Sequence, residues 1–244
     1  MPEVSDHPAI DAEAEARIIR DFLRLTFRRF TETGDTYRSH WLGVPAIKYP
    51  TDLMMYQELI VARRPDLIVE TGTHRGGSAL FLATICELIG HGAVISIDIG
   101  NTPDKQLPQH PRLRFVGGSS TDPDIVAMVH ARAAELGQSR DDGAVAEVMV
   151  ILDSDHRLLH VFEELETYAP LIRPGGYIIA EDTHVNGRPN WPEYGPGPGE
   201  AVALFLTRHP EFAVDDACTR FAMTLNAGGY LRRRALEPNT AVDE

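Results

Sequence analysis

The sequence contains few cysteines, a minority of basic residues and no long apolar run. Its two cysteines, Cys86 and Cys218, lie far apart in apolar surroundings, which indicates reduced core residues, so no disulfide framework is expected. Lysine and arginine number 23 against 36 aspartates and glutamates, and the formal net charge is −13. A chain this acidic is a poor candidate for binding nucleic acid phosphates or anionic membranes.

Membrane and secretion signals are also missing from the sequence. No stretch approaches the roughly 20 apolar residues of a membrane span, and the longest apolar runs, such as Val148–Leu152, suit buried strands. The acidic first residues, Met1–Glu15, lack the apolar core of a signal peptide. We therefore expect a cytoplasmic protein that binds neither membranes nor nucleic acids.

From Pro65 onward, short apolar runs alternate with helical patterns. This alternation is typical of βαβ units, and it predicts an α/β domain with a parallel sheet covered on both faces. The expected strands are Leu67–Val69, Ala93–Ile97, Leu113–Val116, Val148–Leu152 and Tyr177–Ala180, with two last strands around Phe212–Val214 and Phe221–Leu225 and a short continuation over Tyr230–Arg233. The expected helices are Ser78–Ile89, Pro123–Leu136, Leu158–Ile172 and one that ends near Arg208.

The residues before this domain have a different pattern. Apolar positions at helical spacing predict an amphipathic helix over Ile10–Phe30, followed by an irregular segment, Gly34–Pro50. A short helix, Leu53–Ala62, then follows, with Thr51 or Asp52 as its cap. We accordingly divide the chain into an N-terminal helical extension over 1–64, one domain over 65–235 and a tail over 236–244.

A glycine-containing loop follows the first strand, at the edge where doubly wound folds bind their ligands. It runs from Glu70 through Gly72 and Thr73 to Gly76 and Ser78. Glycines here let a ligand approach the backbone beside a helix N-terminus, although a tight strand–helix turn explains them equally well. The Glu-x-Gly-x-x-x-Gly spacing differs from the dinucleotide fingerprint, and the absence of a phosphate-binding lysine counts against an NTPase.

The next two strands end in residues suited to an adenosine group. Asp98 ends the second strand, where an acid can bind a ribose diol, although a lone acid here could also be a loop residue or a cap. The third strand leads into Ser119 and Ser120, small polar residues that suit the edge of an adenine and equally suit a turn. Together with the glycine loop, Asp98 favours an adenosine-containing ligand.

Acidic residues follow the fourth and fifth strands. Asp153 ends one, and Glu181 and Asp182 end the other, so adjacent parallel strands would bring three carboxylates together. Such carboxylates either raise one another's pKa or hold a cation, and all-oxygen ligation suits Mg²⁺. Helix capping, by Ser154 or Asp155, explains one acid in this region but not three.

Histidines near these acids are candidates for a catalytic base. His156 is three residues past Asp153, in the expected first turn of the next helix, where an imidazole can remove a proton near neutral pH. His184 is a secondary candidate. His74 and His160 are interpreted as solvated or capping residues.

The run Val69–Ala79 resembles motif I of class I S-adenosylmethionine-dependent methyltransferases, and the site is similar in logic to Mg²⁺-dependent catechol O-methyltransferases. This resemblance implies a Rossmann-like fold with a mostly parallel seven-stranded sheet. It implies that Glu70, Gly72, Thr73, Ser78, Asp98, Ser119 and Ser120 bind the cofactor and that Asp153, Glu181 and Asp182 bind the metal, where that family has Asp followed by Asp-Asn. His156 stands where those enzymes carry a catalytic lysine.

A longer set of motifs resembles the cephalosporin hydroxylase/rhamnosyl O-methyltransferase family, from Trp41 to about Arg232. The motifs are Trp41-x-Gly43-x-Pro45 with Lys48, Pro50-Thr51-Asp52-Leu53, Tyr56-Gln57-Glu58, the glycine loop, Leu152-Asp153-Ser154-Asp155-His156 and Glu181-Asp182-Thr183. They imply an O-methyltransferase that uses S-adenosylmethionine and Mg²⁺ on a hydroxyl of a natural product or deoxysugar-containing acceptor.

This resemblance also suggests where the acceptor binds and how the chain assembles. The candidate acceptor pocket comprises Asn186–Gly199, with Trp191 and Tyr194, and Trp41–Tyr56, although these aromatics could equally be packed against the domain. Enzymes of this type often assemble into rings or dimers, so we expect a homo-oligomer, with Ile10–Phe30 as the candidate interface.

Two other functions remain open at this point. A non-catalytic partner of a biosynthetic enzyme would bind S-adenosylmethionine without turnover. A metal-dependent hydroxylase would hold iron through His156, His184 and a carboxylate, and would need oxygen.

Overall fold

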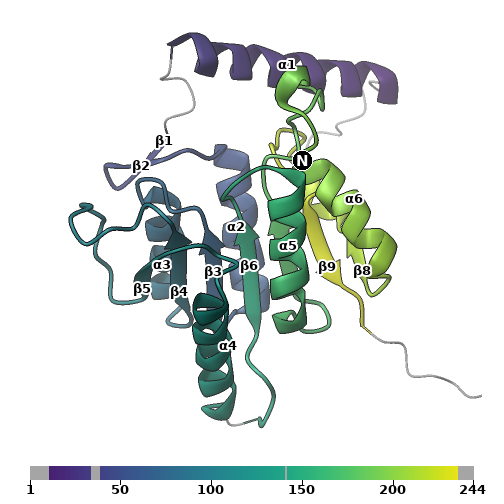
Figure 1. Cartoon of the computed structure of the whole chain (residues 1–244). Helices are drawn as coiled ribbons and strands as arrows, with labels where there is room; N and C mark the ends of the chain where they lie inside the picture. Colours follow the sequence, from purple (N-terminus) through teal and green to yellow (C-terminus); the bar gives the residue numbers. More distant parts are fainter. Residues whose placement is uncertain (1–10, 34–38, 141, 236–244) are drawn as a thin grey trace, which may run out of the picture.

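The computed structural model describes residues 11–33, 39–140 and 142–235 (Figure 1). The expected tail over 236–244 lies outside the described residues. None of the described helices is both long and apolar enough to cross a bilayer.

A seven-stranded sheet forms the centre of the domain, in the order β5-β4-β3-β6-β7-β9-β8. Its first five strands along the chain pair in parallel, and β9 runs antiparallel to both β7 and β8. The expected α/β, Rossmann-like fold is therefore confirmed. The strands are β3 (Leu67–Thr71), β4 (Ala93–Asp98), β5 (Leu113–Gly117), β6 (Val148–Leu152), β7 (Tyr177–Ala180), β8 (Phe212–Val214) and β9 (Tyr230–Arg233).

Helices cover both faces of the sheet because alternate strand residues point to opposite sides. On β6, Val148 and Val150 belong to one apolar cluster, whereas Met149 and Ile151 belong to the other. Figure 1 shows α4 and α5 in front of the sheet, with α2 and α3 behind it. The first cluster includes α4 (Pro123–Gln138), α5 (Leu158–Tyr168) and α6 (Pro198–Arg208), and the second includes α2 (Pro50–Arg63) and α3 (Gly77–Leu88).

The expected strand over Phe221–Leu225 is wrong, because this segment binds α2 instead of a neighbouring strand. The Asp52 carboxylate accepts hydrogen bonds from the Thr224 hydroxyl and the Leu225 amide, and the Thr51 hydroxyl donates to the Met223 carbonyl. Thr51 and Asp52 are therefore not the cap of α2, whose N-cap residue is Tyr49. A 3-10 turn, Asp216–Thr219, precedes the segment.

The supposedly irregular segment before α2 contains a short hairpin, β1 (Ser39–Trp41) and β2 (Val44–Ala46). The Trp41 indole donates to Thr84 at 2.9 Å and its ring meets Phe81 edge-on, so this tryptophan packs on α3.

Helix α1 (Ala12–Thr33) lies across one end of the domain (Figure 1). Its Leu23 packs with Tyr49, and Ile19 joins the same contact. Ile18 and Leu25 are exposed, and the expected self-association through this helix stays a prediction.

We predict that Asp52→Ala lowers the free energy of unfolding by about 3 kcal/mol, because three donors in a buried environment lose their acceptor. The third donor is the Tyr230 hydroxyl, at 3.0 Å. Urea unfolding followed by circular dichroism measures the change. The control, Asp21→Ala on the exposed side of α1, should change stability by less than about 0.5 kcal/mol. Equal effects of the two substitutions would contradict the view that Asp52 is the buried acceptor for these three donors.

Candidate functional site

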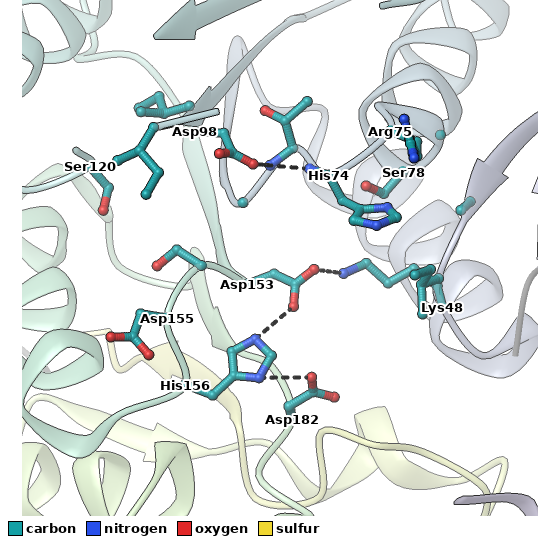
Figure 2. Close-up of a pocket in the computed structure, with 18 of the residues that line it drawn as sticks. Lys48, His74, Arg75, Ser78, Asp98, Ser120, Asp153, Asp155, His156 and Asp182 are labelled. Atoms are coloured by element: carbon teal, nitrogen blue, oxygen red, sulfur yellow. Dashed lines mark hydrogen bonds and ion pairs between the residues drawn. The ribbon is translucent and has the colours of Figure 1, made fainter. Parts of the chain in front are cut away.

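A cavity of about 640 Å³ lies at the carboxyl ends of the parallel strands, where the strand order reverses between β3 and β6 (Figure 2). Pro45 to Lys48, just before α2, form another wall of it. His74 and His160, interpreted from the sequence as solvated or capping residues, also line the cavity. The expected site residues on its wall are Gly72, Thr73, Ser78, Asp98, Ser119, Ser120, Asp153, His156 and Asp182. Glu70 and Glu181 are buried and do not line it.

Gly72 is required where the glycine loop meets the end of β6. Its φ is +85°, and a Cβ atom at this position would lie 1.9 Å from the Asp153 carbonyl oxygen. Its amide donates to the Ile97 carbonyl at 2.8 Å. The glycine therefore forms the turn and also permits the close approach of two loops. A tight turn and a close approach to the backbone, the two interpretations of this glycine loop, are compatible.

Asp98 is an ionised acceptor on the cavity wall. Its carboxylate accepts the amides of Gly100, Thr73 and His74 at 2.6, 2.9 and 3.0 Å. Burial raises the pKa of this carboxyl, but the backbone amides outweigh burial and hold the pKa below its ordinary value. Figure 2 shows this contact with the glycine loop at the upper side of the cavity.

Glu70 is fully buried beneath the glycine loop. Its Oε2 accepts the Ser96 hydroxyl at 2.6 Å, whereas its Oε1 has no hydrogen-bond partner among the described residues. Burial raises the pKa of Glu70 to about 7, even though Lys48 and the hydroxyls of Ser78 and Ser96 lower it. This carboxyl therefore changes its protonation state near neutral pH.

Lys48 lies between two of the expected metal ligands, a role that sequence analysis missed. Its buried ammonium group contacts Asp153 and donates to Glu181 Oε2 at 2.6 Å. The Tyr56 hydroxyl donates to the other Glu181 oxygen at 2.8 Å. Burial alone would lower the Lys48 pKa, but the charges of Asp153 and Glu181 raise it, so this lysine is cationic. The sequence offered one signal for this role of Lys48, which is a charged residue in the apolar stretch Val44–Tyr49.

His156 bridges two carboxylates. Its Nε2 lies 3.3 Å from Asp153 Oδ1, and its Nδ1 lies 3.1 Å from Asp182 Oδ2 (Figure 2). Burial lowers the pKa of the imidazole, but the two carboxylates outweigh it and raise the pKa to about 9. The residue lies in the loop before α5 and not in its first turn, because Arg157 is the N-cap.

His184 contacts the same acid from the other side. Its Nε2 lies 3.3 Å from Asp182 Oδ1, and its Nδ1 lies 3.1 Å from the Asn190 amide. Burial raises the pKa of Asp182, but the neighbouring histidines lower it below its ordinary range.

Among the described residues, one group of acids and histidines has the spacing of a metal site. Ligand atoms of Asp153, His156 and Asp182 all lie within 4.8 Å of one another. Glu181 is outside this group, since its oxygens face Lys48 and Tyr56. The structure thus brings together two of the three expected acids with His156, and it places a lysine between Asp153 and the third acid.

Aromatic residues gather beside His184. Trp191 lies 5.0 Å from Tyr194 between ring centroids, and Phe27 of α1 lies 5.5 Å from His184 and 6.0 Å from Trp191. Trp191 is half exposed. Phe27 therefore connects the aromatics of the Asn186–Gly199 loop to His184, which contacts Asp182, whereas Trp41 packs on α3.

Comparison with known proteins gives a consistent set of relatives. A family model described as rhamnosyl O-methyltransferase/CmcI matches residues 34–234. The rhamnosyl O-methyltransferase of Mycobacterium leprae (strain TN) is 31% identical over 197 residues, which cover 80% of this chain and 82% of the relative. That of Mycobacterium tuberculosis (strain ATCC 25618 / H37Rv) is 34% identical over 200 residues, which cover 80% and 78%.

Solved structures share the fold. A CmcI structure described with Mg and SAM aligns with a TM-score of 0.62 at 21% identity, over 96% of this chain and 89% of that chain. A second CmcI structure, described with SAH, aligns with a TM-score of 0.60 at 20% identity, over 96% and 97%. At this level of identity the comparison establishes the shared architecture alone.

We predict that Glu70→Gln stabilises the protein at high pH and not at low pH. The pKa of about 7 in the folded state exceeds the ordinary value of 4.5, so the stability that Glu70 contributes is lost as pH rises through this window. At about pH 8 the variant should be more stable by up to roughly 3 kcal/mol, and at about pH 4.5 the difference should be small.

Urea unfolding at both pH values measures this difference. The control is Glu163→Gln, an exposed glutamate on α5, which should leave the pH dependence unchanged. A Glu70→Gln variant that is destabilised equally at both pH values would contradict the argument.

Proposed function

The chain belongs to the rhamnosyl O-methyltransferase/CmcI family. From this premise we propose that it transfers a methyl group from S-adenosylmethionine to a hydroxyl of a small deoxysugar-containing natural product, with the help of Mg²⁺. One observation carries the proposal: a single cavity joins the wall formed by Gly72 and Asp98 to the cluster of Asp153, His156 and Asp182.

The cofactor half of the cavity has suitable size and chemistry. The volume of the whole cavity, about 640 Å³, is in the usual range of small-molecule sites. We assign Asp98 to the ribose hydroxyls, since its carboxylate is an ionised acceptor on the wall. When bound, S-adenosylmethionine would supply a methyl group on a positively charged sulfur. We assign Glu70, Gly72, Thr73 and Ser78 to its methionine end, and Ser119 and Ser120 to its adenine.

The unpaired Glu70 oxygen supports the assignment at the methionine end. A fully buried carboxylate oxygen without a donor is costly, and a ligand donor would remove that cost. Ser78, whose hydroxyl lowers the pKa of Glu70, lines the cavity, so the buried acid lies close to the ligand space.

The acidic half of the cavity fits a hard divalent cation. The Lys48 ammonium already lies between Asp153 and Glu181, which is direct evidence that this position favours positive charge. We propose that Asp153, Glu181 and Asp182 hold Mg²⁺, an assignment that requires Glu181 to release Lys48. When bound, the ion would supply charge that lowers the pKa of an acceptor hydroxyl.

We assign the role of general base to His156. Its raised pKa keeps the imidazole protonated beside Asp153 and Asp182, and further positive charge at these acids would favour the neutral ring. The neutral imidazole would then accept the hydroxyl proton during transfer. His184 is less suited to this role, because it is buried and does not line the cavity.

The acceptor would bind beside Asp182. Trp191 and Tyr194 offer flat apolar faces with polar tips, which suit the ring of a sugar. The names of the mycobacterial relatives support a rhamnosyl acceptor class.

We predict that Asp153→Asn abolishes Mg²⁺ binding and preserves cofactor binding, because the substitution removes the charge shared by the metal site and leaves the Asp98 wall intact. Calorimetric titration of S-adenosylmethionine into metal-stripped protein, repeated with Mg²⁺, measures both. The matched control is Asp155→Asn, whose carboxylate is exposed two residues away and outside the acidic cluster.

Cofactor binding to neither wild type nor variant would contradict the proposal and favour the hydroxylase alternative, which iron analysis of the purified protein would then test. Tight cofactor binding without turnover on a panel of rhamnosides and related glycosides would favour the non-catalytic partner.

We predict that His156→Gln lowers kcat by about 100- to 10,000-fold and leaves cofactor affinity within a few-fold of wild type, since the imidazole is assigned to proton transfer and not to cofactor binding. Initial rates on the best acceptor measure this effect. His130→Gln on α4, away from the cavity, is the control. An unchanged kcat in His156→Gln would exclude this histidine as the base.

A further inference from the structure

A buried glutamate lies behind the cavity wall, and nothing in the proposed mechanism uses it. Glu164 of α5 is fully buried, and its ion-pair partner among the described residues is His160, whose Nε2 lies 3.5 Å from Glu164 Oε1. Its Oε2 has no hydrogen-bond partner in the described part of the chain. An incompletely satisfied buried carboxylate lowers stability, and an apolar side chain would pack better. This cost points to a role in the neighbouring cavity.

The other carboxylate oxygen binds two hydroxyls of the cavity wall. Glu164 Oε1 accepts the Ser120 hydroxyl at 2.5 Å and the Ser154 hydroxyl at 2.8 Å. Both serines line the cavity, and the Tyr168 hydroxyl, which donates to the Ser120 carbonyl, fixes the backbone there. Figure 2 shows Ser120 at the end of the cavity opposite Lys48.

Counting protons decides what this wall can offer a ligand. A serine hydroxyl has one proton, and both protons are already donated to Glu164. His160 Nε2 lies 3.0 Å from the Ser154 oxygen and 3.4 Å from the Ser120 oxygen. Because both hydroxyls donate elsewhere, Nε2 must carry the proton in these contacts. The hydroxyl oxygens of Ser120 and Ser154 therefore present lone pairs to the cavity and no donor.

We infer that Glu164 is a positioning residue that makes this wall a hydrogen-bond acceptor and so selects a ligand with an amino group at that edge. The inference rests on the proposed function, in which Ser120 lies at the adenine. The exocyclic amine of adenine donates to such a wall. The carbonyl of hypoxanthine at the same place meets another acceptor and is rejected.

The test compares S-adenosylhomocysteine with S-inosylhomocysteine by calorimetry. Wild type should bind the adenosyl ligand about 10- to 100-fold more tightly. Glu164→Leu frees both hydroxyls to donate, so the ratio of the two ligands' affinities should fall to a few-fold. The melting temperature should stay at or above that of wild type. Glu164→Gln should retain most of the discrimination, because its amide oxygen still accepts both hydroxyl protons. Glu163→Leu, at the exposed neighbouring position, is the matched control.

A Glu164→Leu variant that retains the full ratio would overturn the inference, and so would one that loses affinity for both ligands equally. If Glu164→Leu does not fold, the double variant Ser120→Ala, Ser154→Ala removes the acceptors directly and should lose the discrimination; a retained ratio there would overturn the inference. Failure of the wild type to bind S-adenosylhomocysteine would instead contradict the proposed function, so the two failures are distinguishable.

Discussion

The balance of charge at the carboxyl ends of β3, β6 and β7 is the constraint on which the rest of the site depends. Glu70, Asp153, Glu181 and Asp182 converge there, and Lys48 and His156 compensate them in the described structure. Such a concentration of carboxylates is costly without positive charge. The same cost makes the position favourable for a metal ion and explains why two cationic side chains lie among these acids.

This balance joins the N-terminal extension to the sheet. Lys48 lies immediately before α2, yet it neutralises acids more than a hundred residues later in the chain. Asp52, four residues on, binds the segment that precedes β9. Residues before Pro65 therefore complete the cavity rather than simply cover it. The proposed acceptor region is similarly composite, because Phe27 of α1 meets Trp191 and His184 from the other end of the chain.

The sequence predicted those features that follow from local pattern and sheet topology. Short apolar runs located the parallel strands, and adjacent strand ends brought Asp153 and Asp182 together, as expected. The remaining features depend on partners far away in the chain. The Lys48–Glu181 contact, the Asp52–Thr224 contact that prevents a strand at Phe221–Leu225, and the Glu164 network each join a buried polar group to a distant segment. Periodicity carries no information on which buried polar groups meet.

Methyl transfer itself tests the central claim most directly. The measurement is mass spectrometry of a rhamnoside incubated with the protein and S-adenosylmethionine carrying a deuterated methyl group, with the metal removed by chelation and then restored as Mg²⁺. The account predicts a product labelled on one hydroxyl, formed with Mg²⁺ and lost on chelation. Labelled product formed at the same rate without metal would contradict the view that the acidic cluster is a cation-dependent transfer site.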